Sequence, residues 1–259
     1  MKRFKGSWQL LIDPARTGYE NMARDQGLLD LAEREGIAAL RLYRWEPWCL
    51  SFGRNEPALR RYDREKIAKA GLQCVRRPTG GRAVWHAREL TYSVTAPLEA
   101  FGSLGGAYRE IHLMLSAALL RLGATATLAA AGAPVPALDS GACFASPAGG
   151  EVMVEGAKVI GSAQLQQGPA FLQHGSVLLE DSQHVVEQVT LGSPPASRDR
   201  PLAAILGRSL GFEEAAEAIT AEWADRTADS GPWVGEERLI PLARAHEARF
   251  CSPEWTWRR

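Results

Sequence analysis

Two stretches of the chain repeat apolar residues with the period of an α-helix. Residues 19–35, YENMARDQGLLDLAERE, carry Met22, Leu29 and Ala32 near one face and end before a glycine, which is typical of a helix end. Residues 108–124, YREIHLMLSAALLRLGA, give the clearest helical pattern, with an apolar face of Ile111, Met114, Leu115, Ala118, Leu119 and Leu122. The pattern predicts a long amphipathic helix over each stretch.

Other stretches have the pattern of β-strands. Residues 39–45, ALRLYRW, alternate apolar and basic positions, as a half-buried strand does. Residues 72–77 and 89–97 predict strands on either side of a glycine turn at 78–86, PTGGRAVWH. Residues 151–180 predict consecutive short strands joined by glycine turns, an antiparallel meander.

The remaining segments are short or helical. Residues 62–71 predict a short capped helix, and the chain after about residue 200 is mainly helical, with a break at Pro241. Because strands cluster and helices do not alternate strictly with them, we expect an α+β fold rather than a doubly wound parallel sheet. We find no linker between independent units. Residues 1–259 are therefore expected to form a single domain, with a short, mainly helical C-terminal region from about residue 200.

Composition and charge exclude several function classes. The 259 residues are 46% hydrophobic and 23% charged, which is the profile of a globular protein. Thirty basic residues balance thirty acidic ones, so no net field favours nucleic acid or an anionic membrane. The N-terminus lacks an apolar run long enough for a signal peptide or a membrane span, and the four cysteines show no CxxC spacing. We therefore expect reduced thiols and a cytoplasmic protein.

The glycine turn is the first candidate for chemistry. Two adjacent glycines let backbone N–H groups approach an anion or a carbonyl oxygen closely, and Arg76, Arg77 and Arg82 could add charge-assisted hydrogen bonds. The turn matches neither a Walker loop nor the GxGxxG pattern. A plain hairpin turn with solvated arginines fits the same spacing, and the residues alone leave both interpretations open.

Single residues elsewhere also have two interpretations. His86 and His174 are either structural or functional, and no cysteine or histidine cluster has the spacing of a zinc site. Lys158 is either a solvated strand residue or a cation at a cleft. Cys143 lies in a loop-like stretch, where a nearby cation would make it nucleophilic, although buried free cysteines are common. We assign the other cysteines to packing, and two histidines to helix or surface positions without a role: Cys49, Cys74, Cys251, His112 and His184.

The order of the motifs resembles one known family. RRPTGGRAVWHARELTYSV, then CF, then GAKVIGSAQ, then FLQHGSVLL are similar to the biotin/lipoate protein ligase superfamily. Within it, the sequence looks most like the LipM-type octanoyltransferase branch of lipoate assembly, which is related to lipoate-protein ligase A. The resemblance runs from about Trp8 through Leu179.

This resemblance implies a single α+β catalytic domain whose mixed, largely antiparallel sheet forms an acyl cavity. It implies that Cys143 is an acyl-thioester nucleophile and Lys158 the active-site lysine. It also implies substrate-binding residues on three motifs, namely Arg77, Thr79, Gly80, Gly81 and His86 on the glycine turn, Gly161, Ser162 and Ala163 on the GSAQ turn, and His174 and Gly175 on the last motif.

The implied reaction needs no cofactor. Cys143 would take an octanoyl group from octanoyl acyl carrier protein and pass it to a lysine of a lipoyl domain, such as that of glycine cleavage H protein. Because a thioester is converted to an amide, neither ATP nor a metal is required, and the kinetics should be ping-pong. Two features depart from the branch: the segment ASPAGGEVMVE has small residues where relatives carry polar and aromatic ones, and EGAK lacks a second basic residue.

Other functions fit the same layout. Some relatives are lipoate ligases that use ATP and Mg²⁺ and work with a separate accessory protein, and others transfer acyl groups between carrier domains. The chain after residue 200 is too short for the full accessory domain of a one-chain ligase. A non-catalytic lipoyl-group binding protein is the non-enzyme alternative, but such a binder needs neither Cys143 nor Lys158.

Overall fold

The computed structural model describes residues 3–130, 144, 149–192 and 199–258. In these ranges the strands are β1 (Phe4–Ile12), β2 (Ala38–Tyr43), β3 (Cys49–Phe52), β4 (Gln73–Arg76), β5 (Val84–His86), β6 (Glu89–Pro97), β7 (Ala126–Leu128), β8 (Val152–Val154), β9 (Ala157–Gln167), β10 (Ala170–Leu178) and β11 (Thr227–Pro232). The α-helices are α1 (Gly18–Glu35), α2 (Ala58–Arg61), α3 (Arg64–Lys69), α4 (Leu104–Arg121), α5 (His184–Val189), α6 (Leu202–Leu206), α7 (Phe212–Arg226), α8 (Glu236–Cys251) and α9 (Pro253–Thr256), and a 3-10 turn, η1, spans Leu98–Ala100.

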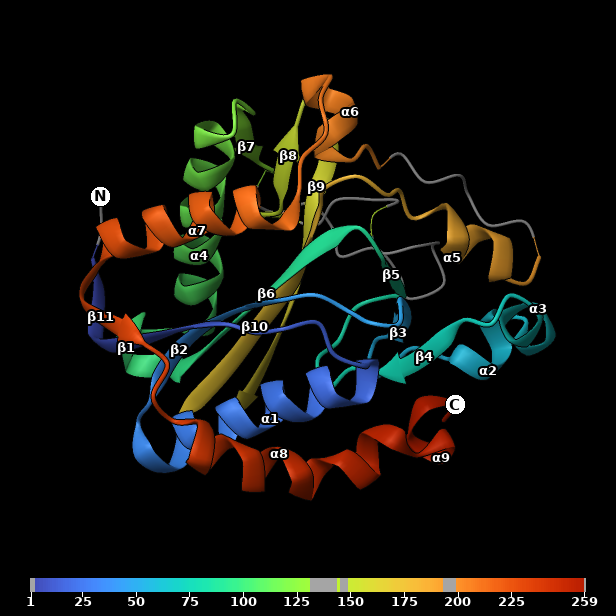
Figure 1. The fold of residues 1–259 in the computed structure, drawn as a ribbon, viewed down its shortest axis with the longest axis horizontal. Coiled ribbons are helices and arrows are strands. Elements are labelled where there is room, and N and C mark those ends of the chain that lie inside the picture. The colour runs from blue at the N-terminus through green and yellow to red at the C-terminus, as the bar shows by residue number, and fades with distance from the viewer. Residues whose placement is uncertain (1–2, 131–143, 145–148, 193–198, 259) are drawn as a thin grey trace.

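The strands form two sheets. The larger is ordered β11-β1-β2-β6-β10-β9-β8-β7, and the smaller β4-β3-β5. In the larger sheet β1 is parallel to β2 and β11, whereas the other neighbours are antiparallel. Helices α4 and α7 cover one face of this mixed sheet, and α1 and α8 lie against the other (Figure 1). The fold is therefore α+β, with a mixed sheet flanked by helices, which confirms the predicted fold class. The predicted antiparallel meander is formed by β8, β9 and β10.

Helix α1 begins and ends where its sequence signals indicate. Thr17 Oγ1 accepts a hydrogen bond from the Glu20 backbone N–H, and the Glu20 carboxylate accepts one from the Thr17 N–H, a reciprocal capping box. Gly36 ends the helix in the left-handed conformation, at φ 70°, which glycine adopts without a steric cost. The helix provides the crossover that two parallel neighbours, β1 and β2, require.

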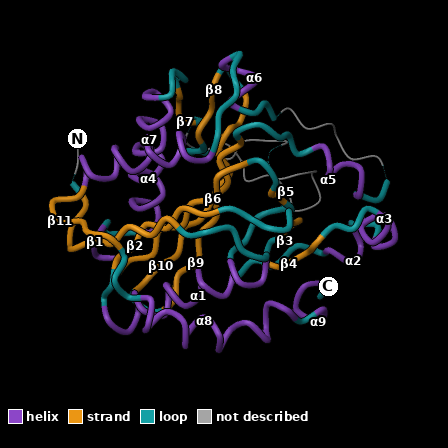
Figure 2. Tube along the Cα trace, in the orientation of Figure 1, coloured by secondary structure: helices purple, strands orange, loops and turns teal. Residues whose placement is uncertain are grey.

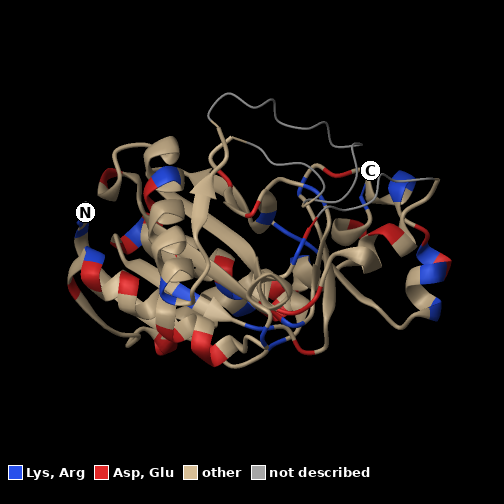
Figure 3. Cartoon of the chain, turned by 90° about the horizontal axis from the view of Figure 1, so that it is seen from above, with Lys and Arg blue, Asp and Glu red and all other residues tan. Residues whose placement is uncertain are grey.

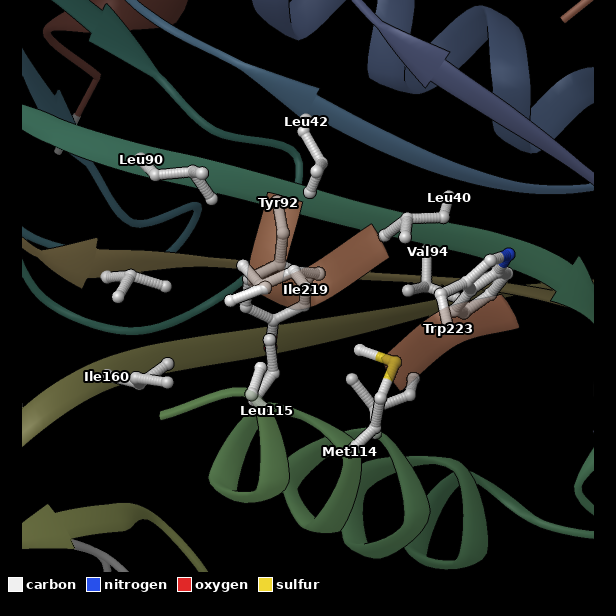
Figure 4. Close-up of a cluster of buried hydrophobic side chains, with 14 of the residues drawn as sticks. Leu40, Leu42, Leu90, Tyr92, Val94, Met114, Leu115, Ile160, Ile219 and Trp223 are labelled. Carbon is white, nitrogen blue, oxygen red and sulfur yellow. The ribbon is translucent and has the colours of Figure 1, made fainter. Parts of the chain in front are cut away.

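The main core lies between the larger sheet and helices α4 and α7. Met114 and Leu115 of α4 point toward Tyr92 and Val94 of β6 and toward Trp223 of α7 (Figure 4). Burial of each large apolar side chain contributes about 1.5–3 kcal/mol. The apolar face that the sequence of α4 predicts is therefore the face that packs against the sheet.

Strand β2 differs from its prediction. Alternation of apolar and basic residues predicted a half-buried strand, but every residue of β2 is buried, including Arg41. Arg41 is accommodated because its guanidinium donates to the carboxylates of Asp13 and Asp25, at 2.8–2.9 Å. A buried charge is tolerated only with such partners.

The region after residue 200 is part of the sheet as well as helical. Strand β11 pairs with β1, and α8 packs along α1 and leads to α9 beside the smaller sheet (Figure 2). The prediction of a break at Pro241 is wrong, because α8 continues through it. Pro241 lies early in the helix, so its missing N–H removes one hydrogen bond near the N-terminal end.

Charged residues of both signs are interspersed along the chain (Figure 3). None of the helices in the described ranges combines the length and the apolar character needed to cross a bilayer.

Candidate active site

A narrow cavity of about 30 Å³ lies where the two sheets meet. Its wall crosses four neighbouring strands of the larger sheet, β2, β6, β10 and β9, and is completed by α1, β5 and the glycine turn. The lining residues are Met22, Tyr43, Trp45, Arg77, Gly81, Val84, His86, Thr91, Gly161, Ser162, Ala163, His174, Gly175 and Ser176.

Most of the expected substrate-binding residues come together here. Arg77, Gly81 and His86 reach the cavity from the glycine-turn motif; Gly161, Ser162 and Ala163 from β9; and His174 and Gly175 from β10. Thr79 and Gly80 belong to the same turn but do not line the cavity. Contact with substrate stays a prediction for all of these residues.

The glycine turn is held by its own buried arginine. Arg77 donates to the carbonyl oxygens of Ser51, Gly80 and Arg82, at 2.8–3.2 Å. The turn also packs on Gly53: a Cβ atom at Gly53 would lie 1.8 Å from the carbonyl oxygen of Gly81. The strands that flank the turn pair with β3 or with the larger sheet instead of with each other, so the turn is not the plain hairpin considered above.

A buried hydrogen-bond chain links the turn to α1. His174 Nε2 lies 2.6 Å from Thr79 Oγ1, and His174 Nδ1 lies 2.9 Å from the carboxylate of Asp25. Burial acts to raise the pKa of Asp25, but the His174 hydrogen bond and the Arg41 charge outweigh it, so the pKa is lowered overall. Asp25 therefore stays ionised and orients the imidazole.

A second imidazole holds the opposite side of the turn. His86 Nε2 lies 2.7 Å from Ser51 Oγ, which also accepts from Arg77, and Nδ1 lies 3.3 Å from the Glu89 carboxylate. The His86 ring stacks on Trp45 at a centroid distance of 4.0 Å. Burial lowers the pKa of both His86 and His174. Both rings are therefore neutral and orient the cavity wall without adding charge to it.

Lys158 lies beside this cavity because of a β-bulge. Val152 pairs with Ile160 while Met153 pairs with Lys158, so β9 contains one extra residue at this point. A Cβ at Gly161 would lie 3.3 Å from Lys158 Cε, which places the lysine next to the cavity-lining glycine. Lys158 Nζ is buried and donates to Glu151 at 2.6 Å. Its distance to the centroid of the Phe144 ring is 5.0 Å.

Two lining glycines are packed too closely to carry a side chain. A Cβ at Gly161 would lie 2.9 Å from the Phe144 ring, and one at Gly175 would lie 2.5 Å from the Gly161 carbonyl oxygen and 2.6 Å from Ser162 Oγ. Glycine is therefore required at both positions by close packing and not by backbone conformation.

The structure also places Arg76 and three of the four cysteines. Cys143 lies outside the described residues, so its role stays a prediction. Arg76 is buried and donates to backbone carbonyls, including those of Gly53 and Glu56, which makes it a structural residue. Cys49 is buried and Cys74 is half-buried, as packing residues are, but Cys251 is exposed, so its assignment to packing is wrong.

Three site residues were not predicted from the sequence. Asp25 pairs with His174 across 149 positions, which no local pattern reveals, and Glu151 pairs with Lys158 only seven positions away, through the pairing of β8 with β9. His112 was given no role, yet it is buried and its Nε2 lies 2.8 Å from Ser162 Oγ. Its position on the α4 face, beside Ile111, was a usable signal of burial. Among the residues that the structure describes, no group of three or more His, Cys, Asp or Glu side chains is arranged to hold a metal ion.

The stability of the protein should decrease as the pH is lowered, because its buried histidines are neutral in the folded state. Burial, with a contribution from the Lys158 charge, lowers the pKa of His112 from 6.5 to about 4. As the pH falls below 6.5 the unfolded chain binds the proton first, so this stability is complete above pH 6.5 and is lost progressively toward pH 4. The loss for His112 is about 3 kcal/mol, at 1.36 kcal/mol per pKa unit. Thermal unfolding at pH 7.5 and pH 4.5 measures it; His112→Asn should show a smaller decrease, and an equal decrease would contradict the assignment.

The fold and the cavity define a class: an α+β domain whose sheet lines a largely apolar site, with a buried lysine–carboxylate pair beside it. Residues 17–224 match the family of the lipoyl protein ligase A/B catalytic domain, and the chain belongs to this family.

Comparisons with individual proteins agree with this family assignment. The chain is 34% identical to octanoyltransferase LipM of Kyrpidia tusciae, with 98% of this chain and 99% of that protein covered. It is 36% identical to octanoyltransferase LipM of Symbiobacterium thermophilum, with 84% and 85% covered. Its fold is similar to the crystal structure of lipoate-protein ligase A bound with ATP, at a TM-score of 0.81 and 19% identity, with 97% and 99% covered. The chain is an acyltransferase, an octanoyltransferase of lipoate assembly, which confirms the function that the motifs predicted.

Proposed function

We propose that the octanoyl group passes through a thioester on Cys143, with octanoyl acyl carrier protein as the donor and a lysine of a lipoyl domain as the acceptor. The observation that carries this proposal is the placement of Lys158. Its ammonium group is buried beside the cavity wall and lies 5.0 Å from the ring of Phe144, the residue that follows Cys143 in the chain. A cation in this position favours a thiolate and stabilises negative charge on an acyl oxygen.

The proposed reaction has two half-reactions. In the first, the Cys143 sulfur forms a bond to the octanoyl carbonyl carbon, and the sulfur of the carrier leaves as a thiolate. In the second, the amine nitrogen of the acceptor lysine forms the bond to that carbon, and the Cys143 sulfur leaves while the amine loses a proton. Lys158 would stabilise the oxyanion in both steps. Because a thioester becomes an amide, neither half-reaction needs ATP or a metal.

The apolar character of the cavity wall, and not its present volume, supports an acyl chain as the transferred group. The wall is lined by Met22, Tyr43, Val84 and the glycine positions, and burial of each methylene contributes about 0.8 kcal/mol. Trp45 and His86, stacked on each other, close the wall near β2, while Gly161 lies near Lys158. We therefore propose that the carbonyl end of the chain lies at β9 and the methyl end near β2.

The acceptor is proposed from the family. A related structure, at 18% identity and a TM-score of 0.76, is described as a bi-partite lipoate protein ligase and its E2 lipoyl domain from Thermoplasma acidophilum. By analogy we propose a lipoyl-domain acceptor for this chain, such as glycine cleavage H protein. The proposed setting is the cytoplasm, where such carriers and reduced thiols occur together.

Intact-protein mass spectrometry with octanoyl acyl carrier protein, in the absence of ATP, tests the proposal. We expect an octanoyl adduct that hydroxylamine removes and that Cys143→Ser fails to form. Cys49→Ser is the matched control and should form the adduct, because the Cys49 thiol is buried and its pKa is raised well above the usual value by burial.

Other outcomes would overturn the proposal in different ways. Product formed only with lipoate and ATP would indicate a ligase. Direct transfer from one lipoyl domain to another would indicate an exchange enzyme. Binding of octanoyl or lipoyl groups without any turnover would indicate a binding protein.

A further inference from the structure

A line of polar side chains crosses the otherwise apolar face of the sheet under α4. Each link is a hydrogen bond of 2.6–3.0 Å, and the links join β9, β10 and β6 before returning to β9 and then to α4. The members in order are Gln164, Gln173, Tyr92, Ser162 and His112. The last link runs from His112 Nδ1 to the carbonyl oxygen of Gly150, at 2.7 Å.

The chemistry of the two ends fixes the direction of every hydrogen bond. The Gly150 carbonyl can only accept, so His112 carries its proton on Nδ1. With the ring neutral, Nε2 must accept from the Ser162 hydroxyl. Ser162 Oγ then accepts from the Tyr92 hydroxyl, which in turn accepts from the Gln173 amide. Each link of the line thus joins one donor to one acceptor, as buried polar groups require.

This line ends next to the lysine site. Gly150 precedes Glu151, whose carboxylate accepts from Lys158 Nζ at 2.6 Å. The backbone on both sides of this peptide also pairs with Ala129: Gly150 N donates to the Ala129 oxygen, and Ala129 N donates to the Glu151 oxygen. His112 therefore fixes a further polar group of the turn, the Gly150 carbonyl, at the point where the chain enters β8.

We propose that His112 is a positioning residue of the acyl-transfer site: as a neutral imidazole it holds the Gly150–Glu151 peptide so that Glu151 keeps Lys158 beside Gly161. His112 does not line the cavity, so it acts through the groups that it holds, the Gly150–Glu151 peptide and the Ser162 hydroxyl, and not on the substrate. The inference rests on the proposed role of Lys158. It accounts for a buried histidine in a core of apolar side chains, where leucine or methionine would otherwise pack.

Three variants separate positioning from packing. His112→Leu fills similar space without hydrogen bonds. His112→Asn retains an N–H near the Nδ1 position that can reach the Gly150 oxygen. Ser116→Ala is the matched control one turn along α4, because its hydroxyl donates only to the backbone oxygen of His112 at 2.8 Å.

The rate of octanoyl-adduct formation is measured against donor concentration. We expect His112→Leu to lower the maximal rate by about tenfold or more, the scale of one lost buried hydrogen bond, while the half-saturating donor concentration changes by less than about threefold. His112→Asn should recover most of the rate, and Ser116→Ala should match the unmodified protein. A full rate in His112→Leu, or an Asn variant as slow as the Leu variant, would overturn the inference.

Two measurements need no substrate, so they separate this inference from the proposed function. The imidazole ¹⁵N spectrum should show a protonated Nδ1 and an accepting Nε2; the opposite tautomer would refute the assigned direction. Amide hydrogen exchange over Val152–Val154 should be faster in His112→Leu than in Ser116→Ala, and equal exchange would count against positioning. If the unmodified protein forms no adduct while both measurements agree, the proposed function fails and the structural role of His112 stands.

Discussion

Replacing Lys158 with methionine is expected to lower the rate of octanoyl transfer by about 10²–10³-fold, the usual effect of removing one group that stabilises an oxyanion. Methionine matches the length of the lysine but removes the ammonium group, so neither the thiolate nor the developing oxyanion is stabilised. The rate of adduct formation and the rate of transfer to a lipoyl domain should both decrease. Lys69→Met, an exposed substitution on α3, is the control and should have no effect.

Stability must be separated from catalysis in this experiment. Lys158→Met leaves the Glu151 carboxylate buried without its ammonium partner, and breaking a buried pair costs about 3–5 kcal/mol. The double variant Lys158→Met/Glu151→Leu removes both charges, so it should regain most of the stability but none of the activity. Recovery of activity in the double variant would show that Lys158 supports the fold rather than the reaction.

Among the glycines that the structure describes, Gly53 is the one whose replacement by alanine is expected to disturb the structure most. The added Cβ would lie 1.8 Å from the Gly81 carbonyl oxygen and 2.6 Å from its carbon, so the glycine turn must move away from β3. Overpacking of this kind costs about 1–3 kcal/mol or more, which corresponds to roughly 2–4 °C in Tm per kcal/mol for a chain of this size. Octanoyl transfer should fall as well, because Gly81 and Arg77 line the cavity.

Gly105→Ala is the matched control for this prediction. Gly105 lies in the first turn of α4 with no atom within 4 Å of an added Cβ, so alanine should leave Tm unchanged or raise it slightly. A Gly53→Ala variant with the Tm and the activity of the unmodified protein would contradict the close approach of β3 to the glycine turn.

Local patterns predicted the parts of this fold that local physics determines. The apolar faces of α1 and α4, the glycine after α1 and the antiparallel strands β8 to β10 all follow from spacings of a few residues. The glycine-turn, GSAQ and QHGS motifs also predicted residues that the structure brings to one cavity, although they lie on elements far apart in the chain.

The rest depends on contacts between distant segments. Asp25 and His174 are 149 positions apart, and nothing near either residue indicates the other. The bulge that brings Lys158 to the cavity side depends on how β9 pairs with β8, which spacing alone does not give. Arg41 follows an alternating pattern typical of a solvated face, yet two carboxylates from other segments allow it to be buried.

The long-range hydrogen bonds of Arg76 have a consequence for folding during synthesis on the ribosome. Its guanidinium donates to the backbone oxygens of Trp255, Thr256 and Arg258, about 180 positions later in the chain, and also to those of Gly53 and Glu56 next to the glycine turn. Before residues 255–258 leave the exit tunnel, Arg76 has its acceptors beside the glycine turn, such as Gly53 and Glu56, but lacks those of the last segment. The glycine turn should therefore reach its full stability only when residues 255–258 emerge.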